Sequence, residues 1–361
     1  MSGPSPGQPR AAVVGTGLIG ASIGLALRHQ GWWVSGFDED VRRAERALEI
    51  GSIDCTGVDG EADVTFVAVP AGAVVDVARD VLSRQHGDQV VTDVAGVKEA
   101  IVASVRHPSF VGGHPMAGSE QEGVDGADPE LFLGATWVLT PDETTSAHAY
   151  AYVQSVVRSL GANPVALAPR RHDEMVALVS HVPHLTAATL MDLAIEAATS
   201  DPSLLRLAAG GFRDMTRVAA GHPGIWPDVV ADNKDAILDS LDRLLGALDK
   251  VRAIVADGDR DGLLALLERA RQGRVNLPVG APAIGQATEV RVPVPDRPGV
   301  IAEVSTLLGS MGVNIFDLEI AHSAEGDRGV MVLVVDTSTE GMVREALLER
   351  GYRASFRRMG Q

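Results

Sequence analysis

The chain has 361 residues, a net charge of −17 and a mean hydropathy of +0.11, which together indicate two or three globular domains. The negative charge argues against nucleic acids and anionic membranes as partners, and no run of about 18 apolar residues predicts a membrane span. A single cysteine, Cys55, excludes an intrachain disulfide and fits a reducing cytoplasm. Residues 1–10 are rich in Pro, Gly and Ser and lack the apolar segment of a signal peptide, so we expect them to form a disordered tail.

The first predicted unit is a strand–turn–helix. An apolar strand over 11–14 leads into the run Gly15-Thr-Gly-Leu-Ile-Gly20 and a helix over 21–27. In this context Gly15 permits a tight turn, Gly17 lets backbone N–H groups reach a pyrophosphate, and Gly20 lets the helix pack on the strand. The new helix N-terminus also favours phosphate. The alternative is a tight turn without a ligand.

The second strand, over 32–37, ends at Asp38. A carboxylate there accepts a hydrogen bond from a ribose 2′-hydroxyl and repels a 2′-phosphate, so the sequence predicts NAD in preference to NADP. The cofactor contacts that we expect are Gly15, Gly17, Leu18, Ile19, Gly20, Asp38, Pro70 and Asp93.

Strands and helices continue to alternate up to residue 169. We expect strands over 63–69, 89–94, 110–113, 136–140 and 164–167, and helices over 73–83, near 98 and over 146–160. Short buried strands between helices predict a parallel sheet covered on both faces, an α/β fold of the Rossmann type over 11–169. Ligands bind beyond the carboxyl ends of such strands, where Pro70, Asp93 and His114 are expected to share one cleft.

The pattern changes twice more. Residues 170–274 have long helical patterns, and the apolar spacing over 228–255 indicates a core or a helix–helix interface, so we expect a helical domain for substrate and dimerisation. Residues 275–286 are predicted to be a linker. Residues 287–361 predict the order β-α-β-β-α-β, which is the ferredoxin-like arrangement.

Three stretches carry residues suited to chemistry. His114 follows a strand where a nicotinamide ring would lie, and a neutral histidine there can accept a proton while hydride leaves the same carbon. The alternative is a histidine that hydrogen-bonds a turn. Arg213 and Arg217 are the best candidate anion anchors in so acidic a chain, since an arginine binds a carboxylate with two hydrogen bonds. Both could instead serve structural ion pairs.

The third stretch, residues 171–184, contains several histidines. His181 and His184 lie three residues apart on one helix face. A two-histidine metal pair lacks a third ligand nearby, so neutral polar contacts in a cleft are favoured and no metal is expected. His172 is interpreted as a surface residue.

Residues 114–120, 180–184 and 212–217 together make the sequence similar to the prephenate dehydrogenase family of tyrosine biosynthesis, with a C-terminal ACT domain. Asn233-Lys234 also fits, and the resemblance covers nearly the whole chain after residue 10. It implies NAD-dependent oxidative decarboxylation of prephenate to 4-hydroxyphenylpyruvate, with His114 hydrogen-bonding and polarising the 4-hydroxyl. It also implies that Arg217 and His184 bind the substrate and that Glu120 and Asp214 order or gate the cleft. Arg213 is added to the substrate-binding residues as an anion anchor.

One position departs from the family. A serine that bonds the catalytic histidine often follows the fourth strand, and this chain has Gly96 there. We expect a water or a backbone group to orient His114, or else a lower rate, and we expect Gly96→Ser to leave activity intact or raise it.

The C-terminal domain resembles ACT modules, which pair side by side and bind amino acids at the junction. The resemblance implies a tyrosine effector site formed by Asp296, Arg297, Pro298, Gly299, Gly312, Val313 and Asn314. The alternative is a dimerisation module without an effector.

We therefore expect a cytoplasmic homodimer that acts on a small molecule. Three rival interpretations remain. The first is an arogenate dehydrogenase, which acts on the same ring with an amino acid side chain. The second is a catalytically silent sensor of NAD and an amino acid. The third is a β-hydroxy-acid dehydrogenase that relies on a helical-domain lysine, for which Lys234 is available although the run at His114 fits poorly.

Overall fold

The computed structural model describes residues 3–118, 121, 123–201, 203–221, 223–275, 287–295, 297–322 and 328–358. Two predicted site residues, Glu120 and Asp296, and residues 276–286 of the predicted linker lie outside them. Contacts divide the chain into two compact units, Met1–Leu248 and Asp249–Gln361, and each is described by itself.

Unit 1 contains an eight-stranded sheet in the order β3-β2-β1-β4-β5-β6-β7-β8. The strands are β1 (Arg10–Val14), β2 (Trp33–Phe37), β3 (Cys55–Thr56), β4 (Val64–Val67), β5 (Val90–Asp93), β6 (Phe110–Pro115), β7 (Thr136–Thr140) and β8 (Asn163–Ala166). Before β1, the Pro9 carbonyl accepts from the Trp33 N–H at 3.0 Å and the Gln8 side chain donates to the Gly31 carbonyl at 2.9 Å, so these two residues of the predicted tail contact the sheet domain.

The Rossmann-type fold is confirmed, and the parallel pairing holds from β3 to β6. The last two strands differ from the prediction, because β7 is antiparallel to β6, and β8 is parallel to β7. Parallel neighbours need a long crossover, usually an α-helix. The described part of the β6–β7 connection has only the 3₁₀ turn Val124–Gly126, so the chain returns in the opposite direction.

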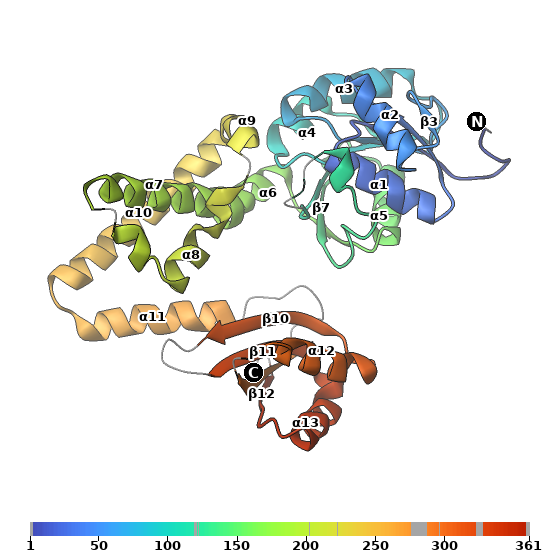
Figure 1. Ribbon diagram of the computed structural model, residues 1–361. Helices are drawn as coiled ribbons and strands as arrows, with labels where there is room; N and C mark the ends of the chain where they lie inside the picture. The colour runs from blue at the N-terminus through green and yellow to red at the C-terminus, as the bar shows by residue number, and fades with distance from the viewer. Residues whose placement is uncertain are drawn as a thin grey trace. The chain divides into compact units, whose positions relative to one another are not determined.

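Helices cover both faces of this sheet (Figure 1). On one face α1 (Leu18–His29) and α5 (Ala147–Ser159) share a core with the strands, and on the other α3 (Ala71–Arg84) and α4 (Glu99–Val105) share a second core. Along β4, Val64 and Phe66 belong to the first core and Val67 to the second. The buried strand is therefore apolar on both sides, as expected for a covered sheet. Helix α2 (Val41–Glu49) contacts β2 and β3.

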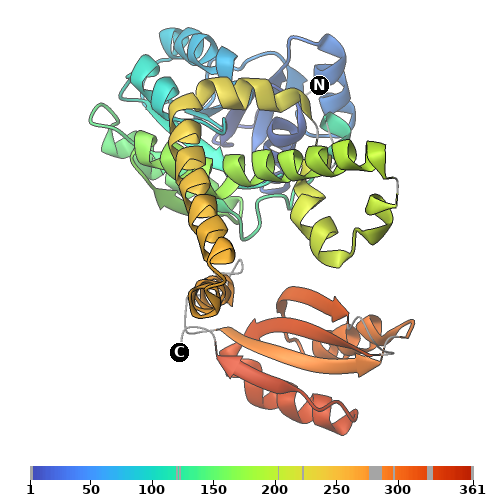
Figure 2. The ribbon, with the colours of Figure 1, turned by 90° about the vertical axis from the view of Figure 1, so that its left-hand side faces the viewer.

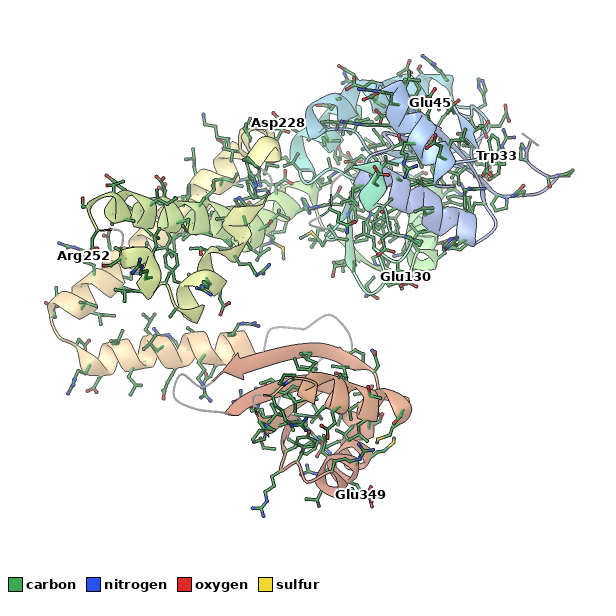
Figure 3. The ribbon with its side chains drawn as sticks, in the orientation of Figure 1. Trp33, Glu45, Glu130, Asp228, Arg252 and Glu349 are labelled. Carbon is green, nitrogen blue, oxygen red and sulfur yellow. The ribbon has the colours of Figure 1, made fainter. Side chains whose placement is uncertain are left out.

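The rest of unit 1 is helical, as predicted. It comprises α6 (Pro169–Val176), the π-helical turn η2 (Ala177–His181), α7 (Val182–Ser200), η3 (Leu204–Leu207), α8 (Gly210–Thr216), η4 (Arg217–Ala220), η5 (Pro223–Ile225), α9 (Trp226–Asp232) and the start of α10 (Lys234–Ala256). Helix α6 packs on α4, and α9, marked by Asp228 in Figure 3, packs on α3. These contacts place the helical segments beside the nucleotide-binding sheet.

The continuous helical segment Pro169–Ser200 has the length and composition of a membrane span, but a single helix of this kind is weak evidence for one. Two of its polar residues, His172 and Asp173, are buried. Asp173 accepts hydrogen bonds from backbone groups at the start of α4. The first turns of the segment are therefore packed against the sheet domain by polar contacts.

Unit 2 contains the end of α10, α11 (Arg260–Val275) and a four-stranded antiparallel sheet in the order β10-β11-β9-β12 (Figure 2). Its elements are β9 (Ala287–Pro295), α12 (Val300–Ser310), β10 (Ile315–His322), β11 (Arg328–Asp336), the 3₁₀ turn η6 (Thr337–Thr339), α13 (Glu340–Glu349) and β12 (Ser355–Arg358). Helices α12 and α13 share one core with the strands. The predicted β-α-β-β-α-β order is confirmed.

Candidate active site

The glycine-rich turn joins β1 to α1 and has the geometry that a pyrophosphate needs. Gly15 has φ +95°, and a Cβ built on it would lie 2.3 Å from the Ala68 carbonyl oxygen. A Cβ on Gly20 would lie 1.9 Å from the Gly15 carbonyl oxygen, whereas one on Gly17 would meet nothing within 4 Å. Positions 15 and 20 thus require glycine for chain packing, while position 17 faces open space.

The N-terminus of α1 lies beside this open space. Leu18 and Ile19 form its first turn, and no side chain caps the helix at Gly17. Free N–H groups and the helix dipole therefore face the space left by Gly17, which suits a pyrophosphate.

Asp38 fixes the other half of the nucleotide site. It is buried, its Oδ2 accepts from the Thr16 N–H at 2.8 Å, and its Oδ1 accepts from the Asp40 N–H at 3.0 Å. The carboxylate is thereby held at the end of β2 next to the glycine turn, where a ribose hydroxyl would reach it. Pro70, exposed before α3, lies close after Ala68, the residue that packs on Gly15. These residues fit NAD.

Asp93 does not fit the predicted contact with the cofactor. It is wholly buried; its Oδ1 accepts from the Gly113 N–H at 3.1 Å, its Oδ2 accepts from the Ala95 N–H at 3.0 Å, and it forms an ion pair with Lys98. The carboxylate is thus used within the protein. Its position at the carboxyl end of a strand misled the prediction, because a strand end can also serve to hold its neighbour. Here it holds the residue before His114.

His114, near the end of β6, is half-buried and contacts a second histidine. Its Nδ1 lies 2.9 Å from Nε2 of His172, and Nδ1 of His172 lies 2.7 Å from Oδ1 of Asp173. His172 has no exposed surface, so its interpretation as a surface residue is wrong. The reason is that α6 turns this side chain toward the sheet domain.

The surroundings of His114 favour its neutral form. Burial holds the pKa of His114 well below its usual value of 6.5, and the neighbouring His172, Lys98 and His181 lower it further. A neutral imidazole keeps a lone pair on one ring nitrogen at physiological pH. The site can therefore accept a proton or a hydrogen bond from a substrate hydroxyl.

The helical segments add a cluster around Trp226. The ring of His184 stacks on Trp226 at 3.7 Å with an interplanar angle of 17°, and the ring of His181 meets it edge-on at 6.1 Å. Asn233 donates to the Asp173 carbonyl at 2.9 Å and lies 3.2 Å from Nδ1 of His181. Burial lowers the pKa of His181 and His184.

Sequence reasoning did not single out Trp226, and it had only the resemblance to point to Asn233. A lone tryptophan before a proline has no periodic signal. An asparagine between two helices indicates only that one helix ends and the next begins.

Arg213 on α8 and Arg217 at the start of η4 are exposed, as is Asp214. Neither arginine forms an ion pair with any residue that the structure describes, which favours a role in binding anions over a structural one. Gly221, just after η4, lies beside His184, since a Cβ built on it would be 3.6 Å from His184 Cε1. The described residues contain no group of three or more His, Cys, Asp or Glu side chains placed to hold a metal ion.

A glycine turn at β1–α1, a carboxylate at the end of β2 and a neutral histidine at the end of β6 define an NAD-dependent dehydrogenase. The sequence matches the family profiles described as prephenate dehydrogenase, nucleotide-binding domain (residues 23–166), prephenate dehydrogenase, dimerization domain (168–269), and ACT domain (288–350). The chain therefore belongs to the prephenate dehydrogenase family.

Known relatives agree. The prephenate dehydrogenase of Bacillus subtilis is 33% identical over 93% of this chain and 95% of its own length. The crystal structure of Synechocystis arogenate dehydrogenase matches with a TM-score of 0.66 and 33% identity, over 73% of this chain and 98% of that one. The structure of Aquifex aeolicus prephenate dehydrogenase in complex with hydroxyphenyl propionate and NAD+ matches with a TM-score of 0.70 and 26% identity, over 75% and 99%.

Proposed function

We propose that this enzyme oxidatively decarboxylates prephenate to 4-hydroxyphenylpyruvate with NAD. The observation that carries the proposal is the setting of His114. One side of its ring, at Nδ1, is bonded to His172. On the other side a Cβ built on Gly96 would lie 3.8 Å from Nε2 and meet only His114 within 4 Å. No residue that the structure describes forms a hydrogen bond with Nε2, so this nitrogen can bind a ring hydroxyl.

The roles of the chain's own residues follow from this geometry. Bound NAD supplies the hydride acceptor. His114 Nε2 takes a hydrogen bond, and then the proton, from the ring hydroxyl as hydride departs from the same carbon. Arg217, supported by Arg213, binds a carboxylate of the substrate, and His184 on its tryptophan platform contacts the substrate side of the cleft. Loss of the ring carboxylate as CO₂ returns its electron pair to the ring, and the ring oxygen takes back the proton from His114 to give the phenol. Aromatisation drives the reaction, so the protein mainly positions and polarises the reactants.

Two substitutions test this assignment. His114→Asn should lower kcat by about 10²–10⁴-fold and leave the Kd for NAD nearly unchanged. Arg217→Ala should chiefly raise KM. Turnover by the His114→Asn enzyme at the wild-type rate would refute the role of the imidazole, and an unchanged KM in the arginine variant would refute anchoring.

A second substrate is supported by the 33% identity to an arogenate dehydrogenase, equal to the identity with a prephenate dehydrogenase. Both substrates carry the same ring hydroxyl and ring carboxylate, so His114 and Arg217 serve either. We infer prephenate as the main substrate from the match over 93% of the chain. Comparing kcat/KM for prephenate and arogenate at matched concentrations decides between them, and a higher value for arogenate would reverse the assignment.

We further propose that the ACT domain binds tyrosine as a feedback effector. Gly299, with φ +89°, precedes α12, and Gly312, with φ +71°, follows it. An 11-residue helix separates the two turns by about 16 Å at 1.5 Å per residue. One amino acid cannot touch both turns of a single chain. A shared site therefore needs the start of α12 from one copy and the end of α12 from another, which supports binding in a dimer.

The proposal is tested at the turn after α12. Asn314→Ala should raise the tyrosine concentration needed for half-inhibition, while Glu349→Ala, on the exposed end of α13, should not change it. Unchanged inhibition in both variants would place the effector elsewhere.

We propose a homodimer in the cytoplasm, supported by the match to a dimerization domain and by exposed apolar side chains on the helices of unit 1, namely Leu193, Ile195, Leu238 and Leu245.

A further inference from the structure

We propose that His172 and Asp173 are positioning residues that fix both the ring orientation and the tautomer of His114. The inference rests on the proposed role of His114 and explains how that role is possible without a hydroxyl at position 96. Asp173, His172 and His114 form a continuous hydrogen-bonded row, with spacings of 2.7 Å and 2.9 Å between successive polar atoms. His172 is wholly buried and Asp173 nearly so.

The row dictates where each proton sits. Oδ1 of Asp173 is an acceptor, so Nδ1 of His172 carries a hydrogen and donates it. In the neutral ring the Nε2 of His172 then holds a lone pair, and it faces Nδ1 of His114. Nδ1 of His114 must therefore carry its own hydrogen, which leaves the lone pair on Nε2, the ring nitrogen on the side of Gly96. The row thus selects the tautomer that accepts a proton from substrate.

Asp173 is itself held firmly. Its Oδ1 accepts from the Lys98 N–H and its Oδ2 from the Glu99 N–H, both at 2.8 Å, and its backbone carbonyl accepts from Asn233 at 2.9 Å. A carboxylate fixed by charge-assisted bonds cannot rotate away from His172.

The row acts from the side of the ring opposite to Gly96. The sequence led us to expect a water or a backbone group to orient His114, and the structure shows a side chain, His172, bonded at Nδ1. Residue 96 lies instead on the side of Nε2 and Cε1, at 3.8 Å and 3.9 Å from a built Cβ. A glycine there supplies no hydroxyl to the ring, and the opposite side already orients it.

Three variants of the full-length enzyme test the role by kinetics. His172→Leu removes the acceptor and should lower kcat by about 10–100-fold, by analogy with the loss of the hydrogen-bond partner of a metal-ligating histidine, with KM and the Kd for NAD little changed. His172→Gln keeps an acceptor near the position of Nε2 and should retain more activity. His148→Gln, on the outer helix α5, is the matched control and should behave as wild type.

Nitrogen NMR of the histidine rings in the cofactor-free protein supplies a readout independent of turnover. In the wild type His114 should show hydrogen on Nδ1 and a free Nε2, and His172→Gln should weaken this preference. Hydrogen on Nε2 of wild-type His114 would overturn the proposal, as would wild-type kcat in a folded His172→Leu enzyme. If His172→Leu does not fold, the wild-type spectrum and His172→Gln still decide. Wild-type turnover by the His114→Asn enzyme, together with the expected wild-type spectrum, would refute the proposed catalytic role of His114 and leave the positioning row standing.

Discussion

Replacing Lys98 by methionine should destabilise unit 1 strongly. The ammonium group is wholly buried and pairs with Asp93, which is wholly buried as well. The same carboxylate accepts from the backbone of Ala95 and Gly113 and so connects the ends of β5 and β6. Methionine preserves most of the side-chain volume, so the substitution removes the charge with little change in packing.

The magnitude follows from the charge left behind. Burial lowers the pKa of Lys98, while Asp93 and Asp173 oppose this effect. A buried ion pair generally adds little net stability, yet removing one partner leaves an uncompensated buried carboxylate. That change costs about 3–5 kcal/mol, against a total of about 5–15 kcal/mol for a typical domain. Adding Asp93→Asn to Lys98→Met removes the stranded charge and should recover about half of the loss.

Denaturant unfolding monitored by tryptophan fluorescence measures this effect. Arg84→Met is the control, because its ion pair with Asp80 is exposed on α3 and should contribute little. A loss of less than about 1 kcal/mol for Lys98→Met, or a further loss when Asp93→Asn is added, would show that the stranded charge is not the cause. The reasoning about the ion pair would then be wrong.

Three further outcomes are expected. Gly17→Ala should fold normally but bind NAD weakly, measured by calorimetry, whereas Gly20→Ala should lower the Tm, because its Cβ would lie 1.9 Å from a carbonyl oxygen; equal Tm values for the two variants would contradict this. Burial lowers the pKa of His114 and His181, so the unfolded chain takes up protons as pH falls below about 6.5 while the folded chain resists them. The free energy of unfolding should therefore be unaffected by these histidines above that pH and should decline below it. A Tm that rises when the pH is lowered from 7.5 to 5.5 would exclude the effect. Gly96→Ser should leave kcat intact or raise it, since a Cβ there would lie in ordinary contact 3.8 Å from Nε2 of His114, and a large loss of turnover would refute that.

The elements of the fold could be predicted where the signal is local. Neighbouring residues encode the glycine turn, the apolar strands and the helical periodicity. The bounds of β1 and α1 lie close to the predicted ranges, and the β-α-β-β-α-β order is the predicted one. The reversal of β7 could not be predicted, because strand direction depends on the connection, and residues 116–135 carry no strong pattern of either kind. The two-residue strand β3 and the break at Asn233 between α9 and α10 are likewise set by tertiary contacts.

The residues of the candidate site likewise fall into those with a local sequence signal and those that depend on tertiary contacts. Gly15, Asp38 and His114 could be proposed as site residues from the sequence, because their positions after a strand already imply a ligand. His172 was missed because its helix carries Arg171 and Glu174, which form an exposed ion pair, and a histidine among charges resembles a solvated face. Its function depends on a partner 58 residues away in the chain, a separation that no local pattern contains. The role of a buried polar side chain depends on its hydrogen-bond partner, and the fold determines which residue that partner is.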